Sequence, residues 1–460
     1  MTQLYGERPH SRQSRATPTK HPSRCAGEMT APRARSTPSP LRSPDRSPDG
    51  PSHARASANR ATRLDGLDLA RGLAVLGMVV AHLGPPHPGF DWTRPESWSA
   101  VVDGRSAVLF ALCAGVSLTL MTRSRPEGAP GAADLVVHRR RVLVRAVALF
   151  VLGSLLIALN TPVQVILPTY AGCFVATIPL LRARTRTVAA IAATALVIGP
   201  VCTAIGRSLL HDADDPIVHG VLLGAYPGIP WWGVVLVGLL VGRLPLRRTR
   251  LHLVLLAGGI TAAVVGYGGG VLARAALGLP PGTASPSGSA SAGSAGGSEP
   301  ASGTTSGAGA VGGLPDAGPH LVPKGGGTLE HPGIDWAGLT SVQPHAGSTP
   351  EVLGALGVAV AVLALSLVVA RPAGALLAPV RAVGALALTV YAAHIVVHAA
   401  LDAVAGDRWH TEWRAALLVI VGAGLLATPW RRWLGAGPLE RLVRRTSRSL
   451  DGPGPRSRPH

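Results

Sequence analysis

The sequence predicts an all-α, polytopic integral membrane protein with about ten transmembrane helices and both termini in the cytosol. Apolar residues make up 47% of the 460 residues, whereas only 15% are charged. The apolar residues fall in blocks of about 17–22, which is the length that crosses a bilayer. Arginines crowd alternate connecting loops, as the positive-inside rule requires. We therefore attribute the net charge of +19 to topology.

Ten apolar segments match this length. They lie at approximately 66–84, 104–122, 142–159, 164–181, 187–206, 228–243, 252–272, 352–370, 382–401 and 414–430. With the N-terminus inside, each inner loop carries arginines, such as the run from Arg139 to Arg141. The outer loops carry isolated cations beside acids such as Asp91. One missed or extra span would break this alternation, so the loop charges support the count of ten.

Composition divides the chain into five regions. Residues 1–60 form a basic Arg/Ser/Pro-rich tail, 61–278 hold the first seven spans, 279–350 form a Gly/Ser/Pro-rich extracytoplasmic loop, 351–435 hold the last three spans and 436–460 form a second basic cytosolic tail. The first tail lacks the apolar core of a signal peptide. Its Arg/Ser/Pro-rich composition leads us to expect a disordered cytosolic segment. We expect the far end of the loop, around Trp336, to dock onto the membrane domain.

Several chemistries find no support in the sequence. The cysteines Cys25, Cys113, Cys173 and Cys202 are scattered, so neither a disulfide framework nor a metal site is expected. A phosphate-binding loop with a Walker-type lysine is missing, which argues against ATP-driven work. The basic residues do not surround an aromatic-rich fold, which argues against nucleic acid. The predicted surroundings are a lipid bilayer, and a homo-oligomer is a possible assembly.

The first span carries two ionisable residues, Arg71 and His82, eleven positions apart. Eleven residues are close to three helical turns, so both side chains emerge on one stripe about 16 Å apart. Asp68 stands three positions before Arg71 and can pair with it. Ionisable groups at such depth are costly and usually face a cavity or a partner helix. The alternative is that each side chain reaches the nearer membrane surface as an anchor.

Several strings of the chain resemble transmembrane acyltransferases. DLARGLAVLGMVVAH has the D-x-x-R-G start and R-x10-H spacing of the first helix in the acyltransferase-three superfamily and in heparan-alpha-glucosaminide N-acetyltransferase-like proteins. SWSAVVDGRSAVLFALCAGVSLTL resembles the second helix of the latter group, and GAYPGIPWWGVVLVGLLVGRLPL resembles a later span of its bacterial members. LTVYAAHIV and GPLERLVRR are similar to related bacterial membrane proteins of unassigned function. The resemblance covers most of the membrane part.

The resemblance implies acyl transfer across the cell (plasma) membrane. An acetyl group would pass from cytosolic acetyl-CoA, as co-substrate, to an amine or hydroxyl of an extracytoplasmic glycan-type acceptor. In such families a histidine at the outer end of the early helices carries the chemistry. His82 fits the R-x10-H spacing, and His87, five residues later, is the alternative. Some members place the key histidine just before a Ser-Trp pair such as Ser97–Trp98, but here the residues 94–96 are Arg-Pro-Glu, a departure that favours His82.

Two mechanisms fit a histidine in this position. His82 could act as a general base that deprotonates the acceptor, or its imidazole could accept the acetyl group and pass it on. Arg71 would then hold a phosphate or the thioester oxygen, with Asp68 orienting it.

Further candidates surround the outer face. Asp103 and Arg105, at the entrance of the second span, are predicted either to form an interfacial ion pair or to bind the acceptor. Tyr226 and His345 are also acceptor-binding candidates, although Tyr226 with the nearby Trp231 and Trp232 favours an aromatic belt at the membrane interface. His394 and His398 stand four apart, a spacing compatible with metal, but without a third ligand we interpret them as packing residues.

Two other functions remain as alternatives. A small-molecule transporter or permease also places ionisable groups within spans. Transporters commonly contain paired repeats with broken helices, which are not evident here, although Pro162, Pro168 and Pro179 could interrupt the fourth span. A non-enzymatic scaffold is the second alternative, and it would leave the Arg71 and His82 stripe without a purpose.

Overall fold

The computed structural model describes residues 65–85, 89–122, 132–210, 218–280, 333–370, 372–406, 409 and 413–449. Several sequence predictions lie outside these ranges. They concern the N-terminal tail, the Gly/Ser-rich stretch between residues 281 and 332, the last residues of the chain and the alternative catalytic residue His87.

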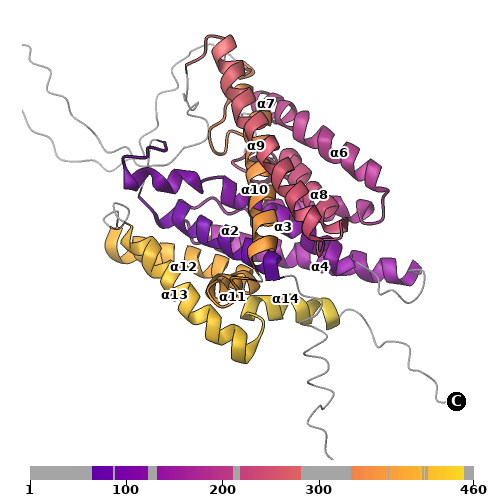
Figure 1. The fold of residues 1–460 in the computed structure, drawn as a ribbon, viewed down its shortest axis with the longest axis vertical. Helices are drawn as coiled ribbons and strands as arrows, with labels where there is room; N and C mark the ends of the chain where they lie inside the picture. Colours follow the sequence, from indigo (N-terminus) through magenta and orange to yellow (C-terminus); the bar gives the residue numbers. More distant parts are fainter. Residues whose placement is uncertain are drawn as a thin grey trace, which may run out of the picture. The chain divides into compact units, whose positions relative to one another are not determined.

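The described ranges contain helices and turns and no β-strand. The helices, drawn in Figure 1, are α2 (Asp65–Leu83), α3 (Arg105–Thr122), α4 (Ala132–Ile157), α5 (Leu167–Thr177), α6 (Thr185–Val197), α7 (Gly199–Leu209), α8 (Gly228–Arg243), α9 (Thr249–Ala276), α10 (Thr349–Val369), α11 (Ala378–Ala385), α12 (Ala387–Ala405), α13 (Arg414–Pro429) and α14 (Pro438–Ser449). Short helical turns add η1 (Pro95–Val101), η2 (Ile178–Leu180), η3 (Val218–Leu223), η5 (Gly338–Thr340) and η7 (Trp430–Leu434). The predicted all-α class is confirmed.

Within these ranges, six helical segments are long and apolar enough to cross a membrane. They are α2, η1 with α3, α9, α10, α12, and α13 with η7. The pair α6 and α7, bent by 45°, makes a seventh if it is one span, and α5 with η2 and α8 are shorter apolar helices. Each of the ten predicted segments is thus helical, while the count of ten spans and the orientation of the termini stay predictions.

The bend between α6 and α7 has a local cause. Pro200 stands in the first turn of α7, where it lacks a backbone N–H for the preceding turn. The helices on either side therefore diverge at Ile198 instead of continuing as one rod. The sequence expectation had placed such an interruption in the fourth predicted span, whereas the structure has it in the fifth.

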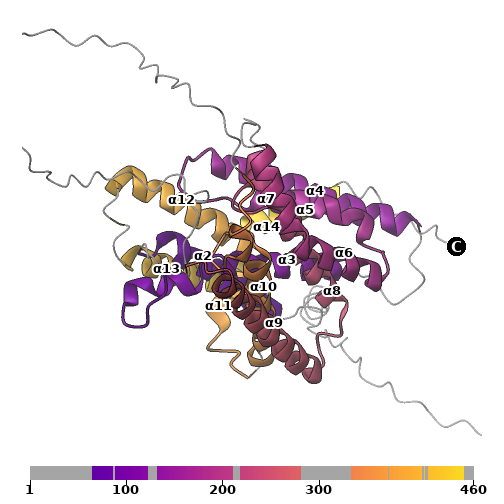
Figure 2. The same cartoon turned by 90° about the horizontal axis from the view of Figure 1, so that it is seen from above.

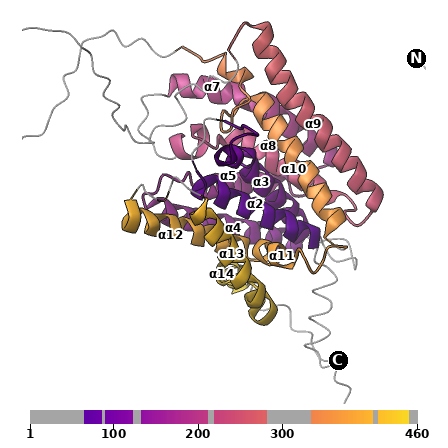
Figure 3. The same ribbon diagram turned by 60° about the vertical axis from the view of Figure 1, so that its left-hand side comes forward.

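The first two spans lie at the centre of the bundle. In Figure 3, α2 and α3 lie between α9–α10 on one side and α12–α13 on the other. The view from above in Figure 2 agrees, with α12 and α13 lying together and α9 beside α10. Tyr170, Phe174 and Tyr391 are the largest fully buried side chains among the described residues, and they fill the space beside α3. This arrangement encloses the polar residues of α2 within the bundle.

Small residues allow α11 to touch α2 directly. A Cβ atom on Gly384 of α11 would lie 1.7 Å from the backbone oxygen of Asp68, and one on Gly72 would lie 2.1 Å from the backbone oxygen of Val380. Such close backbone approach is typical of helix pairs in membranes, where small residues let the helices pack. The crossing places the start of α12 beside the middle of α2, since Val75 packs with Leu386 and Val390.

We expect Gly384→Ala to destabilise the bundle, because even one methyl group at this crossing forces the two backbones apart. Overpacking of this kind costs about 1–3 kcal/mol. The measurement is the midpoint of thermal unfolding of the purified protein in detergent. Gly422→Ala in α13 is the matched control, since a Cβ there meets nothing within 4 Å. Equal midpoints for the two variants would contradict the assignment of this crossing.

Candidate active site

One part of the site is built around Arg71, in the first half of α2. Its Nη1 lies 3.2 Å from Oδ1 of Asp68, and its Nη2 donates a hydrogen bond to the hydroxyl of Ser117 in α3. Asp68 is 2% exposed, so its carboxylate needs these partners inside the bundle. The predicted pairing of Asp68 with Arg71 is therefore present, and Ser117 is a partner that the sequence analysis missed.

Further arginines reach the same end of α2. Nη2 of Arg431, in η7, lies 3.5 Å from Oδ2 of Asp68, and Nη1 of Arg381, in α11, lies 3.3 Å from Oδ2 of Asp65. Two carboxylates on the first turns of α2 thus join three arginines from different helices. The guanidinium of Arg71 faces α3, with a quarter of its side chain exposed. This end of α2 is where an anionic group could meet fixed positive charge.

A second part of the site, at the C-terminal end of α2, contains a pair of histidines. Nδ1 of His82 lies 3.0 Å from Nε2 of His394 in α12, and the two rings are stacked at an angle of 13° with centroids 5.3 Å apart. His394 is 1% exposed. Which nitrogen carries the proton depends on the tautomers. One imidazole therefore donates to the other at the position where the sequence predicted a catalytic histidine.

The contact with His82 changes the interpretation of His394. The spacing of His394 and His398 predicted a packing role for both, yet His394 contacts the predicted catalytic side chain. The signal in the sequence was its depth in an apolar span, because a polar ring there requires a partner. His398 fits the packing interpretation better, since its Nδ1 lies 2.9 Å from Oδ2 of Asp402. The other oxygen of that carboxylate, Oδ1, accepts a hydrogen bond from Nε1 of Trp409.

An aromatic cluster adjoins the histidine pair. The ring of Tyr391 meets that of His394 edge to face at 5.2 Å, and Phe110 is stacked on Tyr391 at 6.3 Å. Tyr170 continues the cluster, with its ring 5.8 Å from that of Phe110, and its hydroxyl donates to the carbonyl oxygen of Ala107. These rings occupy the bundle interior between α3, α5 and α12, and they keep the histidine pair in apolar surroundings.

A second polar cluster lies just before the starts of α3, α8 and α10. Nε2 of His345 lies 3.2 Å from Oδ1 of Asp103, and its ring meets Tyr226 edge to face at 5.4 Å. His345 adopts a φ of 63°, a left-handed conformation that is uncommon for a side chain with a Cβ. Asp103 and His345 both interact electrostatically with His82. Three predicted site residues from distant segments are thus brought together.

The segment that carries His345 packs onto the membrane domain, as the sequence predicted. Pro344 lies against Gly104, and Gly347 lies against Pro227. Ser348 then caps α10 by accepting a hydrogen bond of 3.1 Å from the backbone N–H of Glu351. The cap and the packing hold His345 over the ends of α3 and α8.

Two expectations about the residues around Asp103 and Tyr226 are corrected. Tyr226 and Trp231 are each only 6% exposed, so the aromatic-belt interpretation is wrong for both. Arg105 directs its Nε to the hydroxyl of Tyr267 at 2.9 Å, whereas Asp103 contacts His345, so the two residues serve different partners. Burial raises the pKa of Tyr226 above its usual range, which keeps its hydroxyl protonated.

Two family models match the chain. A family model described as the catalytic part of heparan-alpha-glucosaminide N-acetyltransferase matches residues 63–269, and one described as a protein of unknown function (DUF418) matches residues 336–449. The resemblance predicted from the motifs is confirmed. Residues 63–269 are a heparan-alpha-glucosaminide N-acetyltransferase-like region. Searches of curated proteins and of solved structures found no match.

The candidate site joins the two matched regions. Asp68, Arg71, His82 and Asp103 belong to the heparan-alpha-glucosaminide N-acetyltransferase-like region, whereas His345 and His394 belong to the region of unknown function. The described ranges therefore form a helical protein with six or seven candidate membrane spans, and residues 63–269 are similar to the catalytic part of heparan-alpha-glucosaminide N-acetyltransferase. Among the residues that the structure describes, no group of three or more His, Cys, Asp or Glu side chains is arranged to hold a metal ion.

The pairing of His345 with Asp103 predicts a pH-dependent stability. Burial lowers the pKa of His345, but the hydrogen bond and charge of Asp103 and the charge of Glu351 outweigh it, so the pKa lies above its usual 6.5. A raised histidine pKa stabilises the fold fully below the unfolded-state pKa of about 6.5, and this contribution is lost as the pH rises through the folded-state value.

We therefore expect the native protein to exceed Asp103→Asn in thermal stability by more at about pH 5.5 than at about pH 9. The measurement is the unfolding midpoint of both proteins in the same detergent at each pH. His345→Gln should lose the same pH-dependent part as Asp103→Asn. A stability difference that stays constant, or that grows toward alkaline pH, would show that the pair is not ionised.

Proposed function

We propose that this protein is a plasma-membrane acetyltransferase that transfers an acetyl group from cytosolic acetyl-CoA to an amine or hydroxyl of an extracytoplasmic glycan-type acceptor. The observation that carries the proposal is the hydrogen bond between His82, at the C-terminal end of α2 in the matched catalytic region, and His394 of α12. The proposal includes ten spans with both termini in the cytosol. It also places the Arg71 end of α2 toward the donor.

The tautomer of the histidine pair determines what His82 can do. If Nδ1–H of His82 donates to Nε2 of His394, the lone pair on Nε2 of His82 is free to react. As a general base, this nitrogen takes the acceptor's proton while the acceptor's oxygen or nitrogen attacks the thioester carbonyl. The C–S bond then breaks and the coenzyme leaves as a thiolate that is protonated in turn.

The covalent alternative uses the same nitrogen. Nε2 of His82 attacks the thioester carbonyl, the C–S bond breaks, and the acetyl group is carried on the imidazole until the acceptor displaces it. In both routes Nε2 of His394 accepts the hydrogen bond from Nδ1–H of His82 and so stabilises the positive charge that develops on His82. His394 is therefore a positioning residue, comparable in role to the third member of a nucleophile–base–orienter arrangement.

Arg71 serves the donor in this proposal. Its guanidinium is oriented by Asp68 and Ser117, so it is fixed before a ligand arrives, which favours binding of a phosphate or of the thioester oxygen. Asp103, His345 and the protonated hydroxyl of Tyr226 lie at the outer ends of the helices and offer an acceptor, a titratable group and a donor for a sugar-like molecule. Arg105, held by Tyr267, is a further acceptor-binding candidate.

We expect His82→Ala to lower acetyl transfer by roughly 100-fold or more, the usual contribution of a general acid–base group. His394→Ala should lower it strongly as well, because the tautomer of His82 is then no longer selected. The measurement is the transfer of labelled acetyl groups from external acetyl-CoA to glucosamine enclosed in inside-out vesicles. His252→Gln is the control, since that buried histidine bonds the backbone oxygen of Leu246 at 2.8 Å.

The same assay decides the remaining assignments. Label retained on the native protein without acceptor, and lost in His82→Ala, would establish the covalent route. If His87→Ala alone abolishes transfer, the assignment of His82 is wrong. The bent pair α6 and α7 is the observation that favours a transporter, since broken spans are common there. Uptake of labelled glucosamine without acetyl-CoA, together with no acetyl transfer, would favour that function.

We expect Arg71→Lys to raise the KM for acetyl-CoA roughly tenfold, because lysine keeps the charge but loses the forked geometry that binds phosphate. The KM for the acceptor should stay unchanged, since the acceptor is proposed to bind at the other end of α2. Arg274→Lys, at a buried arginine that bonds the backbone oxygen of Pro280, is the matched control. A change in the KM for the acceptor alone would show that Arg71 binds the acceptor and not acetyl-CoA.

A further inference from the structure

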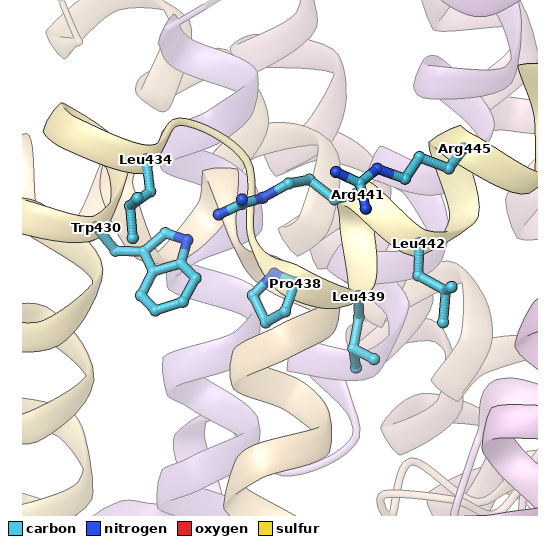
Figure 4. A pocket seen from close by; sticks show the side chains of 7 residues that line it. All are labelled: Trp430, Leu434, Pro438, Leu439, Arg441, Leu442 and Arg445. Atoms are coloured by element: carbon cyan, nitrogen blue, oxygen red, sulfur yellow. The ribbon is translucent and has the colours of Figure 1, made fainter.

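A pocket of about 500 Å³ lies between η7 and the C-terminal helix α14. The residues that line this pocket do not include the pair of His82 and His394 or the cluster of Asp103, Tyr226 and His345. Its wall is apolar along one side, where Trp430, Leu434 and Leu442 contribute, and basic along the other, where Arg441 and Arg445 contribute. Figure 4 shows the two arginine side chains extending back along α14 in the direction of Trp430.

Arg441 lies beside an aromatic ring, and Arg445 stands one helical turn away from it. Arg441 lies 5.5 Å from the ring of Trp430, and its Nε donates to the backbone oxygen of Ala436 at 2.7 Å. Its Nη2 is buried and has no hydrogen-bond partner among the residues that the structure describes. Arg445 stands one turn later on the same side, and like charges at this spacing repel each other. An anion between or beside the guanidinium groups would relieve both effects.

The apolar wall limits which anion fits. Leu434 is 54% exposed and Leu442 is 58% exposed, so hydrocarbon side chains border the opening. The pocket lies at the C-terminal end of α13 with η7, one of the candidate membrane spans. α14 also carries arginines beside leucines, a composition typical of helices that lie in the membrane interface and attract anionic lipids. A ligand with a phosphate and a hydrocarbon chain matches both walls.

We propose that this pocket binds one anionic phospholipid, with its phosphate at Arg441 and Arg445 and the upper part of an acyl chain along Trp430, Leu434 and Leu442. The site is independent of the proposed acetyl transfer. Its position is fixed by Glu440 of the same helix, which accepts hydrogen bonds of 2.8 and 3.2 Å from the backbone N–H groups of Leu388 and Thr389 at the start of α12. These hydrogen bonds hold α14 against the start of α12.

The test uses the full chain reconstituted in phosphatidylcholine vesicles that contain a small fraction of brominated lipid. Bromine quenches tryptophan fluorescence on contact, and the contribution of Trp430 is the difference between the native protein and Trp430→Phe. Brominated phosphatidylglycerol is expected to quench Trp430 more than brominated phosphatidylcholine at the same fraction. In Arg441→Gln with Arg445→Gln, the preference should fall roughly tenfold or more, since each basic side chain near the surface contributes about 1 kcal/mol.

Arg432→Gln with Arg444→Gln is the matched control, because it removes the same charge from η7 and α14 outside the pocket and should keep the preference. Arg441→Lys with Arg445→Lys retains the charge and should keep a reduced preference, which decides the matter if the glutamine variant does not fold. Equal quenching by both lipids, or a preference lost equally in the control, would overturn the proposal. Displacement of the brominated lipid by free CoA or by inorganic phosphate would overturn it in favour of a soluble phosphate ligand.

Discussion

The structure depends on satisfying the ionisable side chains of α2 inside an apolar bundle. An imidazole or guanidinium removed from water is costly unless it is hydrogen-bonded or paired. Arg71 is satisfied by Asp68 and Ser117, and His82 is satisfied by His394. Because these partners come from α3 and α12, both helices must pack on α2 in one register. The polar pairs therefore specify how the bundle is assembled as well as where chemistry can occur.

Backbone packing makes this register possible. The crossing at Gly384 and Gly72 lets α11 touch α2, so that the chain leaves α11 beside Val75 and reaches His82 two turns into α12. The carboxylate of Glu440 in α14 then caps α12 by accepting hydrogen bonds from the backbone N–H groups at the start of that helix. The position of His394 thus rests on contacts made well away from its ring, at a helix crossing and at a helix end.

The site also relates the two matched regions to each other. The heparan-alpha-glucosaminide N-acetyltransferase-like region supplies His82, Arg71 and Asp103, whereas the region of unknown function supplies His394 and His345. The hydrogen bonds between His82 and His394 and between Asp103 and His345 therefore each join one residue from either region. A histidine whose tautomer is selected by a second histidine is suited to proton or acyl transfer, so the proposed function gives the second region a part in the chemistry.

The sequence by itself determined the helical class, the helical segments and the pairing of Asp68 with Arg71, because these follow from composition and from spacing within one helix. It also marked His82, Asp103 and His345 as candidates. Only the tertiary structure decided that His394 is the partner of His82, since 312 positions separate them and helical periodicity carries no information across that distance. The burial of Tyr226 and Trp231 was decided in the same way, by which helices pack together.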